Sequence, residues 1–163
     1  QGRNAFPFAR VGYEVSVMDI SSVAVAQMNA RAQAEGLSLH AEEGDIFARG
    51  ISGEYDMIVC AFLLHFYPRA QSGSLLREIK KHTAHGGYNA VAAFTTKGDF
   101  YRESAGRDRC YFLPGELAAM YAGWEHVFPP LEQWGDGVEA RADGRPKRNV
   151  SAHVLAQTPW LIV

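Results

Sequence analysis

The stretch Tyr55-Asp56-Met57-Ile58-Val59-Cys60-Ala61 decides the fold class of this chain. Its second half is apolar on both faces of a strand, whereas strands of antiparallel sheets commonly alternate between apolar and polar side chains. A short apolar run of this kind indicates a strand in the middle of a parallel sheet that is covered on both sides. We therefore expect an α/β protein.

Helix and strand patterns alternate on both sides of this stretch. Ser21 or Ser22 can cap an Ala-rich helix that Gly36 ends, and Gly86-Gly87 is expected to stop a second, amphipathic helix. Strands that alternate with helices predict a parallel sheet with right-handed crossovers. The expected strands are 15–18, 37–41, 55–61 and 88–94, and the expected helices are 23–35 and 74–83.

The last third of the chain has a different pattern. A long polar loop is expected over 95–113, followed by a helix over 114–122 and a strand that ends at Phe128. The turn Asp143-Gly144 lies between two strand-like segments, which predicts a β-hairpin. Its expected strands are 138–142 and 149–157.

Length and composition limit the classes of protein. The 163 residues favour one domain over 1–163, and the net charge of −2 gives no electrostatic reason to expect nucleic acid or a membrane surface as a partner. Cys60 and Cys110 belong to no paired motif, so neither a disulfide framework nor a metal site is expected. No apolar run approaches the roughly 20 residues needed to span a bilayer. A cytoplasmic protein is the default expectation.

Three strand ends carry candidate ligand-binding residues, because ligands of open parallel sheets bind beyond the carboxyl ends of the strands. Asp19 follows the first expected strand, and its carboxylate can accept hydrogen bonds from two ribose hydroxyls. Asp45 follows the next strand, where it can accept a bond from an adenine amino group while Ile46 packs on the ring. Both aspartates also suit local helix-capping roles, and Cys60-Ala61-Phe62 at the third strand end also suits a plain core.

The opening residues Gln1-Gly2-Arg3-Asn4 precede a short apolar segment, and no initiator Met is present. A glycine in such a loop lets the backbone approach a ligand, and N–H groups at a helix start favour a carboxylate. A glycine-bearing turn, a short helix and a strand that ends in an acid are typical of part of a nucleotide-binding unit. We therefore expect the first strand of that unit to be missing from this chain.

The segments GRN, GYEVSVMD, GDI, EYDMIVCAFLLHFYP, HGGYNAVAAF, PGEL and YAGWEHV occur in this order. In order and spacing they resemble class I S-adenosylmethionine-dependent methyltransferases, most of all the tellurite-resistance type. The resemblance implies a Rossmann-like sheet that is mostly parallel with a late antiparallel hairpin strand. It also implies that the chain starts just inside the glycine-rich loop that follows the family's first strand.

The same resemblance implies a residue-by-residue role for the strand ends in binding S-adenosylmethionine. Asp19 would hold the ribose, Asp45 and Ile46 would meet the adenine, and the third strand end would line the methionine side. The implied cofactor-binding residues are Gly2, Arg3, Asn4, Asp19, Ile20, Ser21, Asp45, Ile46, Cys60, Ala61 and Phe62.

The implied reaction is methyl transfer to a small molecule, for instance a metalloid oxyanion such as tellurite or selenite, or a thiol. Such acceptors bring their own electron pair, so a dedicated base is optional. His65 is a candidate catalytic residue beside the third strand, although a lone His among apolar residues is more often simply packed. Arg141 is the second candidate, because we expect it inside a hairpin strand where it can grip an oxyanion.

Two other functions fit parts of the pattern. An acid at the second strand end of the nucleotide-binding unit also suits the ribose of a nicotinamide cofactor, which makes an NAD(P)-dependent oxidoreductase the first alternative. The expected loss of the first strand makes a non-catalytic remnant of the methyltransferase fold the second. The sequence does not name the methyl acceptor, because one fold serves many substrates.

Overall fold

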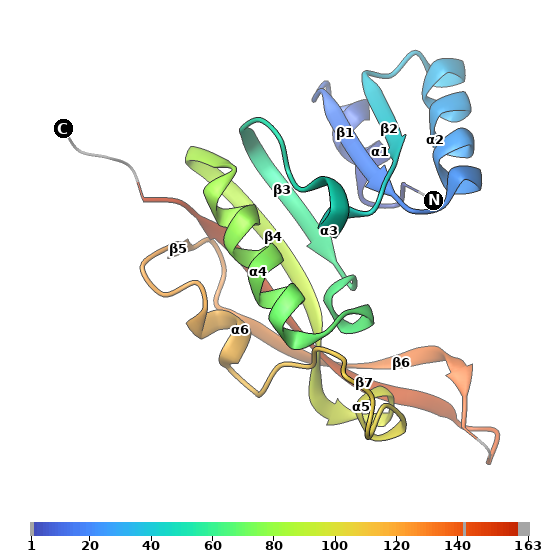
Figure 1. Ribbon diagram of the computed structural model, residues 1–163, viewed down its shortest axis with the longest axis vertical. Coiled ribbons are helices and arrows are strands. Elements are labelled where there is room, and N and C mark those ends of the chain that lie inside the picture. Colours follow the sequence, from blue (N-terminus) through green and yellow to red (C-terminus); the bar gives the residue numbers. More distant parts are fainter. Residues whose placement is uncertain (1, 142, 160–163) are drawn as a thin grey trace. The chain divides into compact units, whose positions relative to one another are not determined.

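The computed structural model describes residues 2–141 and 143–159, and it divides the chain into two compact units, Gln1–Ile51 and Ser52–Val163. Figure 1 shows helices and strands in both units. Each unit has its own pairing of strands and its own packed interior. One domain over residues 1–163 stays a prediction.

The first unit is a two-stranded parallel sheet with helices. Val15 lies opposite Leu39 and Asp19 lies opposite Glu43, so the carboxyl ends of both strands meet at one edge. The elements are α1 (Ala5–Arg10), β1 (Val15–Asp19), α2 (Ser22–Glu35), β2 (Leu39–Glu43) and α3 (Ile46–Arg49).

Local hydrogen bonds explain where α2 begins and how it holds β2. The Ser21 hydroxyl accepts a bond from the Ala24 N–H at 3.2 Å, and Gly36 ends the helix in the left-handed conformation, as predicted. The Asn29 amide bonds both the N–H and the carbonyl of Ala41, each at 2.8 Å. One side chain of α2 thereby bonds backbone groups at the edge of β2, which a neighbouring strand would otherwise bond. The buried core of this unit comprises Phe6, Ala9, Met28, Ala32, Leu39 and Ala41.

The second unit is a sheet in strand order β3-β4-β7-β5, and β6 also pairs with β7. The β3–β4 pair is parallel and every pair that includes β7 is antiparallel, which confirms a parallel α/β sheet with late antiparallel strands. The strands are β3 (Tyr55–Ala61), β4 (Thr83–Gly98), β5 (Glu125–His126), β6 (Leu131–Ala140) and β7 (Pro146–Gln157).

Several strands have an edge without a strand partner within residues 2–141 and 143–159, and β1 and β3 are among them. The strand β1 pairs with β2 alone, and β3 pairs with β4 alone. The expectation that a strand is missing before Gly2 stays a prediction.

Helix α4 covers one face of the sheet in the second unit. Figure 1 shows α4 lying along β3 and β4, and its side chains Leu75, Leu76 and Ile79 are buried. Along β7 every second residue from Val150 to Ala156 is buried, while the residues between them are partly exposed. No helix among the described residues is long and apolar enough to cross a membrane. The helices are η1 (Leu64–Phe66), α4 (Arg69–Lys81), α5 (Asp99–Glu103) and α6 (Glu116–Ala119).

A buried polar network links α4, β4 and the segment after α6. The Asn89 amide donates to the Thr83 hydroxyl at 2.6 Å, and the Tyr121 hydroxyl donates to the Asn89 oxygen at 3.1 Å. The Thr83 hydroxyl donates in turn to the carbonyl of Ile79 at 2.7 Å. Burial raises the pKa of Tyr121, so this phenol stays a hydrogen-bond donor. Each buried polar group of the network therefore has a partner.

The diglycine Gly86-Gly87 does not stop α4, contrary to the sequence expectation. The helix begins earlier and ends at Lys81, and Gly86-Gly87 lies inside β4, which is longer than expected at both ends. The Gly86 N–H donates to the Thr158 hydroxyl at 2.6 Å, so the long-range pairing with the end of β7 determines the conformation here.

Other boundaries also differ from the expected ones. The expected polar loop contains the end of β4 and the helix α5, and the expected helix over 114–122 is shortened to α6. The strand β6 begins at Leu131 rather than at residue 138, β2 is shifted by two residues, and α3 was not expected.

A close approach of backbone atoms requires a glycine at Gly87. A Cβ at Gly87 would lie 2.8 Å from the backbone oxygens of both Ala84 and Asp56. We expect Gly87→Ala to lower the free energy of unfolding by about 1–3 kcal/mol, because neither backbone can move freely. Urea denaturation followed by circular dichroism measures the change.

Gly73 is the matched control, because it lies inside α4 and its Cβ would have as its nearest neighbour the Arg77 guanidinium at 3.9 Å. Gly73→Ala should raise the stability by about 0.5–1 kcal/mol. Equal effects of the two substitutions would contradict the close approach at Gly87.

Candidate functional site

Asp19 and Asp45 lie at the carboxyl edge of the two-stranded sheet in the first unit. The Gly44 N–H donates to the carbonyl of Asp19 at 3.0 Å, which holds the two strand ends together. One carboxylate oxygen of Asp19 accepts from the Ser21 N–H, and one of Asp45 accepts from the Phe47 N–H, each at 2.9 Å. Within the described residues the other oxygen of each carboxylate makes no hydrogen bond, so each acid both bonds a backbone N–H at a helix start and keeps an acceptor oxygen.

Apolar side chains stand beside both carboxylates. Ile20 follows Asp19 with 67% of its surface exposed, and Ile46 follows Asp45 partly exposed. An exposed apolar surface next to a free acceptor oxygen is the combination that a nucleoside needs, because its base is flat and its hydroxyls are polar.

The loop of Gly2, Arg3 and Asn4 begins α1. Gly2 has a φ of +70°, and a Cβ there would lie 2.6 Å from the Phe6 ring. Its carbonyl accepts from the N–H groups of Ala5 and Phe6, each at 3.0 Å. In this conformation those two N–H groups are not available to a ligand carboxylate, which limits the anion site expected at this helix start. The side chains of Arg3 and Asn4 are exposed.

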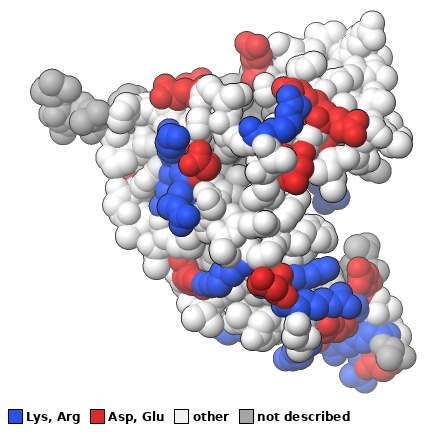
Figure 2. Space-filling model, in the orientation of Figure 1, with Lys and Arg blue, Asp and Glu red and all other residues white. Residues whose placement is uncertain are grey.

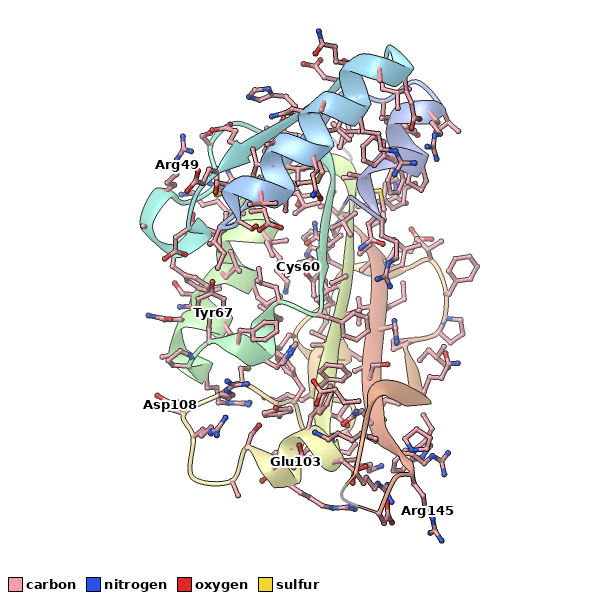
Figure 3. The ribbon with its side chains drawn as sticks, turned by 90° about the vertical axis from the view of Figure 1, so that its right-hand side faces the viewer. Arg49, Cys60, Tyr67, Glu103, Asp108 and Arg145 are labelled. Carbon is pink, nitrogen blue, oxygen red and sulfur yellow. The ribbon has the colours of Figure 1, made fainter. Side chains whose placement is uncertain are left out.

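The three residues Cys60, Ala61 and Phe62 have different surroundings in the second unit. Cys60 lies in β3 (Figure 3), opposite Val91, and is buried in the core. Burial raises the pKa of its thiol to about 12, so the sulfur is protonated at neutral pH. Ala61 is partly exposed on the opposite face, and Phe62 begins the loop after the strand.

Phe62 adopts a backbone conformation that side chains rarely tolerate. Its φ is +55°, the one positive φ outside glycine among the residues described. Its N–H donates to the carbonyl of Ala92 at 2.8 Å, and its ring contacts the rings of Phe94 and His153, with centroid distances of 5.0 Å and 6.1 Å. Such outliers persist where the surroundings over-determine them and concentrate at functional sites.

The strain at Phe62 can be measured with a pair of substitutions. Both Phe62→Gly and Phe62→Ala remove the ring, but glycine adopts a positive φ without the Cβ penalty. We expect the glycine variant to be more stable than the alanine variant by about 1 kcal/mol in urea denaturation. The same pair at the exposed Phe66, which has no positive φ, should show the opposite order.

His65 lies in η1 inside a group of aromatic rings. Its imidazole centroid is 4.1 Å from that of Phe66, 4.8 Å from that of Phe94 and 6.3 Å from that of Tyr111. The side chain is 7% exposed, and its Nδ1 is buried without a hydrogen-bond partner. Burial, and then the positive charge of Arg109, lower its pKa to about 4. His65 is therefore neutral near physiological pH.

The titration of His65 should appear in the stability of the protein. Its pKa is lowered from the ordinary value of 6.5 to about 4, so the unfolded chain binds a proton more readily in that range. We expect the free energy of unfolding to fall as the pH drops from 6.5 towards 4. The dependence should weaken in His65→Gln and persist in the control His85→Gln, whose imidazole is exposed. An unchanged dependence in His65→Gln would contradict this assignment.

Arg141 does not lie inside a hairpin strand, contrary to expectation. The strand β6 ends at Ala140, and the Arg141 N–H donates to the carbonyl of Arg145 at 2.7 Å in the turn that follows. The sequence pattern predicted a strand that continues past Arg141, but the chain already turns at this residue. The predicted strand therefore could not show where the Arg141 side chain lies.

The guanidinium of Arg141 is paired with Asp99 at the start of α5. Its Nε donates to Asp99 Oδ2 at 2.8 Å, and its Nη2 lies 2.7 Å from the same oxygen. Asp99 also accepts from the Arg148 N–H at 2.7 Å and from Arg102 at 3.2 Å. The Arg148 N–H and the Arg141 charge lower the pKa of Asp99. The anion that pairs with Arg141 in this structure is therefore the carboxylate of Asp99.

Charges of both signs are interspersed around α5 and the hairpin, as Figure 2 shows. Lys147 bonds Glu103 at 2.6 Å and Glu139 at 2.8 Å. Paired charges of this kind do not form a surface of one sign, which long-range attraction of an anionic substrate would need.

The described residues of the second unit form at least two cavities. One of about 300 Å³ is lined by Pro114, Ala118, Leu131, Glu132 and His153 among others. The other, of about 430 Å³, lies by Glu54, Lys80, Lys81, His85 and Pro159. No residue predicted to bind cofactor or to act in catalysis lines either cavity.

Sequence reasoning missed His153 and Asp99. The alternation over 149–157 contained a signal for His153, because positions 151, 153, 155 and 157 of a strand share one face. For Asp99 the local sequence gave little signal, because its partners Arg141 and Arg148 lie far along the chain and its one close partner is the exposed Arg102.

The parallel pairs, the crossover helix α4 and the late antiparallel strands define a Rossmann-like class I methyltransferase fold. The crystal structure of TehB from Haemophilus influenzae superposes with a TM-score of 0.83 and 26% identity, covering 96% of this chain and 54% of that one. Solved methyltransferases of lower identity share the fold alone.

The sequence model of the tellurite resistance protein TehB family matches residues 1–145, and the chain belongs to this family. It is 32% identical over 133 residues to the "Probable S-adenosyl-L-methionine-dependent methyltransferase TehB" of H. influenzae, covering 78% of this chain and 44% of that protein. It is 29% identical over 165 residues to "Hemagglutinin 1" of Eikenella corrodens, covering 98% of this chain and 52% of that protein. The chain thus spans about half the length of the curated relatives it matches.

Proposed function

We propose that this chain binds S-adenosylmethionine and transfers its methyl group to a small-molecule acceptor. The observation that carries the proposal is Asp19, which ends β1 with one carboxylate oxygen bonded to the Ser21 N–H and the other without a partner among the described residues. Family membership and the name of the Haemophilus relative support the same cofactor.

The residues of the first unit fit the adenosine part of this cofactor. The Asp19 carboxylate would accept from the ribose hydroxyls, and Asp45 would accept from the adenine amino group. Ile20 and Ile46 offer apolar surface to the purine. For the methionine end of the cofactor we propose contacts with Gly2, Arg3 and Asn4 and with Ala61 and Phe62. The Cys60 thiol is buried, so Cys60 would contact the cofactor through its backbone alone.

The bound cofactor would supply a methyl group on a positively charged sulfur, so the protein has to orient the acceptor and exclude water. For the acceptor we propose a metalloid oxyanion, after the family's link to tellurite resistance, or a thiol. His65 would then act as a neutral imidazole in an aromatic wall. Arg141 would have to share its charge between an oxyanion and Asp99, which supports a thiol better than an oxyanion.

The nicotinamide-dependent oxidoreductase has weaker support, because the antiparallel strands around β7 and the family match favour the methyltransferase. A non-catalytic remnant would fold without binding any adenosyl ligand. Calorimetric titration with S-adenosylhomocysteine and, separately, with NAD⁺ distinguishes the three functions.

Asp19→Asn provides the test of the cofactor site. The substitution keeps the shape of the side chain and removes its charge, so we expect affinity for S-adenosylhomocysteine to fall by about 10–100-fold, the worth of a charged hydrogen bond. Isothermal titration calorimetry measures the affinity, after circular dichroism has shown that each variant is folded.

Glu14→Gln is the matched control, because Glu14 is exposed and lies just before β1, at the end opposite to Asp19. It should bind as the parent chain does. Unchanged affinity in Asp19→Asn would rule out the ribose role, and no binding by the folded parent chain would favour the remnant.

A further inference from the structure

The pairing of four strands in the second unit places one histidine at the level where β3 ends. Ala61 of β3 lies opposite Ala92 of β4, Ala92 lies opposite His153 of β7, and His153 lies opposite Leu131 of β6. Paired residues of neighbouring strands share a face of the sheet. His153 therefore stands on the same face as two small side chains, at the level where β3 ends.

Ligands of such sheets bind beyond the carboxyl ends of the parallel strands, and β3 ends at this row. Phe62 follows directly with a strained backbone, and its ring contacts those of Phe94 and His153. Phe62 is 39% exposed and His153 is partly exposed, so a ligand can reach both.

Ser151 holds the imidazole of His153. Its hydroxyl lies 2.7 Å from Nε2, the one hydrogen bond of this side chain within residues 2–141 and 143–159. Ser151 lies two residues earlier on the same face of β7, opposite Phe94. In the tautomer whose Nε2–H donates to Ser151, the lone pair is on Nδ1.

The surroundings keep this imidazole neutral near physiological pH. Burial lowers the pKa of His153 below its ordinary value. Two titratable groups near this face are His65 and Glu132. His65 of η1 is itself neutral and contacts Phe94, and Glu132 of β6 is paired with the neighbouring strand position Ala152 and accepts from the Gly115 N–H.

We propose that His153, oriented by Ser151, accepts the proton of the methyl acceptor, and that this acceptor is a thiol. The proposal rests on the proposed methyltransferase function and adds the acceptor class and a catalytic residue. In the balanced step the acceptor sulfur gains the methyl group, and the methyl–sulfonium bond breaks with its electron pair left on the donor sulfur. The thiol proton passes to Nδ1 of His153.

The chemistry of this face fits a thiol better than an oxyanion. An oxyanion is bound best by fixed cations, whereas this face offers two neutral imidazoles and the rings of Phe62 and Phe94. Sulfur makes favourable contacts with aromatic rings. A neutral base beside those rings converts a poorly reactive thiol into the thiolate that attacks.

The test compares two thiol acceptors in the parent chain and in His153→Gln. An alkyl thiol is mostly protonated near neutral pH and needs a base, whereas an aromatic thiol is already ionised and does not. We expect His153→Gln to lower kcat/KM for the alkyl thiol by about 100-fold and for the aromatic thiol by less than about threefold. The loss with the alkyl thiol should shrink as the pH rises and the thiol ionises without help.

Two further variants separate chemistry from folding. Ser151→Ala should cause a smaller loss with the alkyl thiol, because the imidazole remains but is no longer oriented. His85→Gln, at an exposed position near the start of β4, should leave both rates unchanged. Circular dichroism and S-adenosylhomocysteine affinity should be the same in all variants.

A measurement without turnover follows the imidazole itself. In nitrogen-15 spectra of histidine-labelled protein, His153 should show the Nε2–H tautomer, and addition of the alkyl thiol should shift its signals. Ser151→Ala should mix the tautomers.

Equal losses with both thiols, or no loss with either, would overturn the role of His153. Turnover of selenite or tellurite but of neither thiol would overturn the acceptor class. If calorimetry shows no S-adenosylhomocysteine binding by the folded parent chain, the proposed function fails and this inference falls with it.

Discussion

The antiparallel pairing of β4 with β7 is the constraint on which the second unit depends. Its register runs from Tyr88 opposite Gln157 to Gly98 opposite Asn149, so it brings β7 beside β4 from the first half of the unit. The same ladder puts His153 opposite Ala92 and brings the Arg148 N–H to Asp99. A shift of this pairing by one residue would turn His153 to the other face and would remove both arrangements.

The local sequence was sufficient where short-range physics decides the structure. Ser21 and Gly36 mark the two ends of α2, and the apolar run of β3 has the predicted bounds, because caps and periodicity act over a few residues. The local sequence gave a wrong prediction at Gly86-Gly87. A diglycine often ends a helix, but here the Thr158 hydroxyl and the pairing with β7 extend β4 through these two residues. The strand position of Arg141 failed for the same reason, because the pairing partner sets where β6 ends.

The residues of the candidate site also divide into those that the local sequence predicts and those that only the pairing of strands reveals. Asp19 and Asp45 were predictable because each lies at the end of a recognisable strand, and the structure adds that each also accepts a backbone N–H at the start of the helix that follows. The local hydrogen bond and a ligand contact therefore do not compete, because one carboxylate oxygen of each acid serves each purpose. His153 was hidden among the alternating residues of a hairpin strand, because its neighbours across the sheet, not along the chain, give it a role.

The position of Asp99 has a consequence for the order in which the chain can fold. Its partners Arg141 and Arg148 are 42 and 49 residues further along, so ordering α5 against them closes a long loop. During synthesis the carboxylate of Asp99 stays in contact with water until the residues of the hairpin have been synthesised. The region around α5 is therefore expected to be among the last parts of the second unit to become ordered, and most exposed to proteases in the nascent chain.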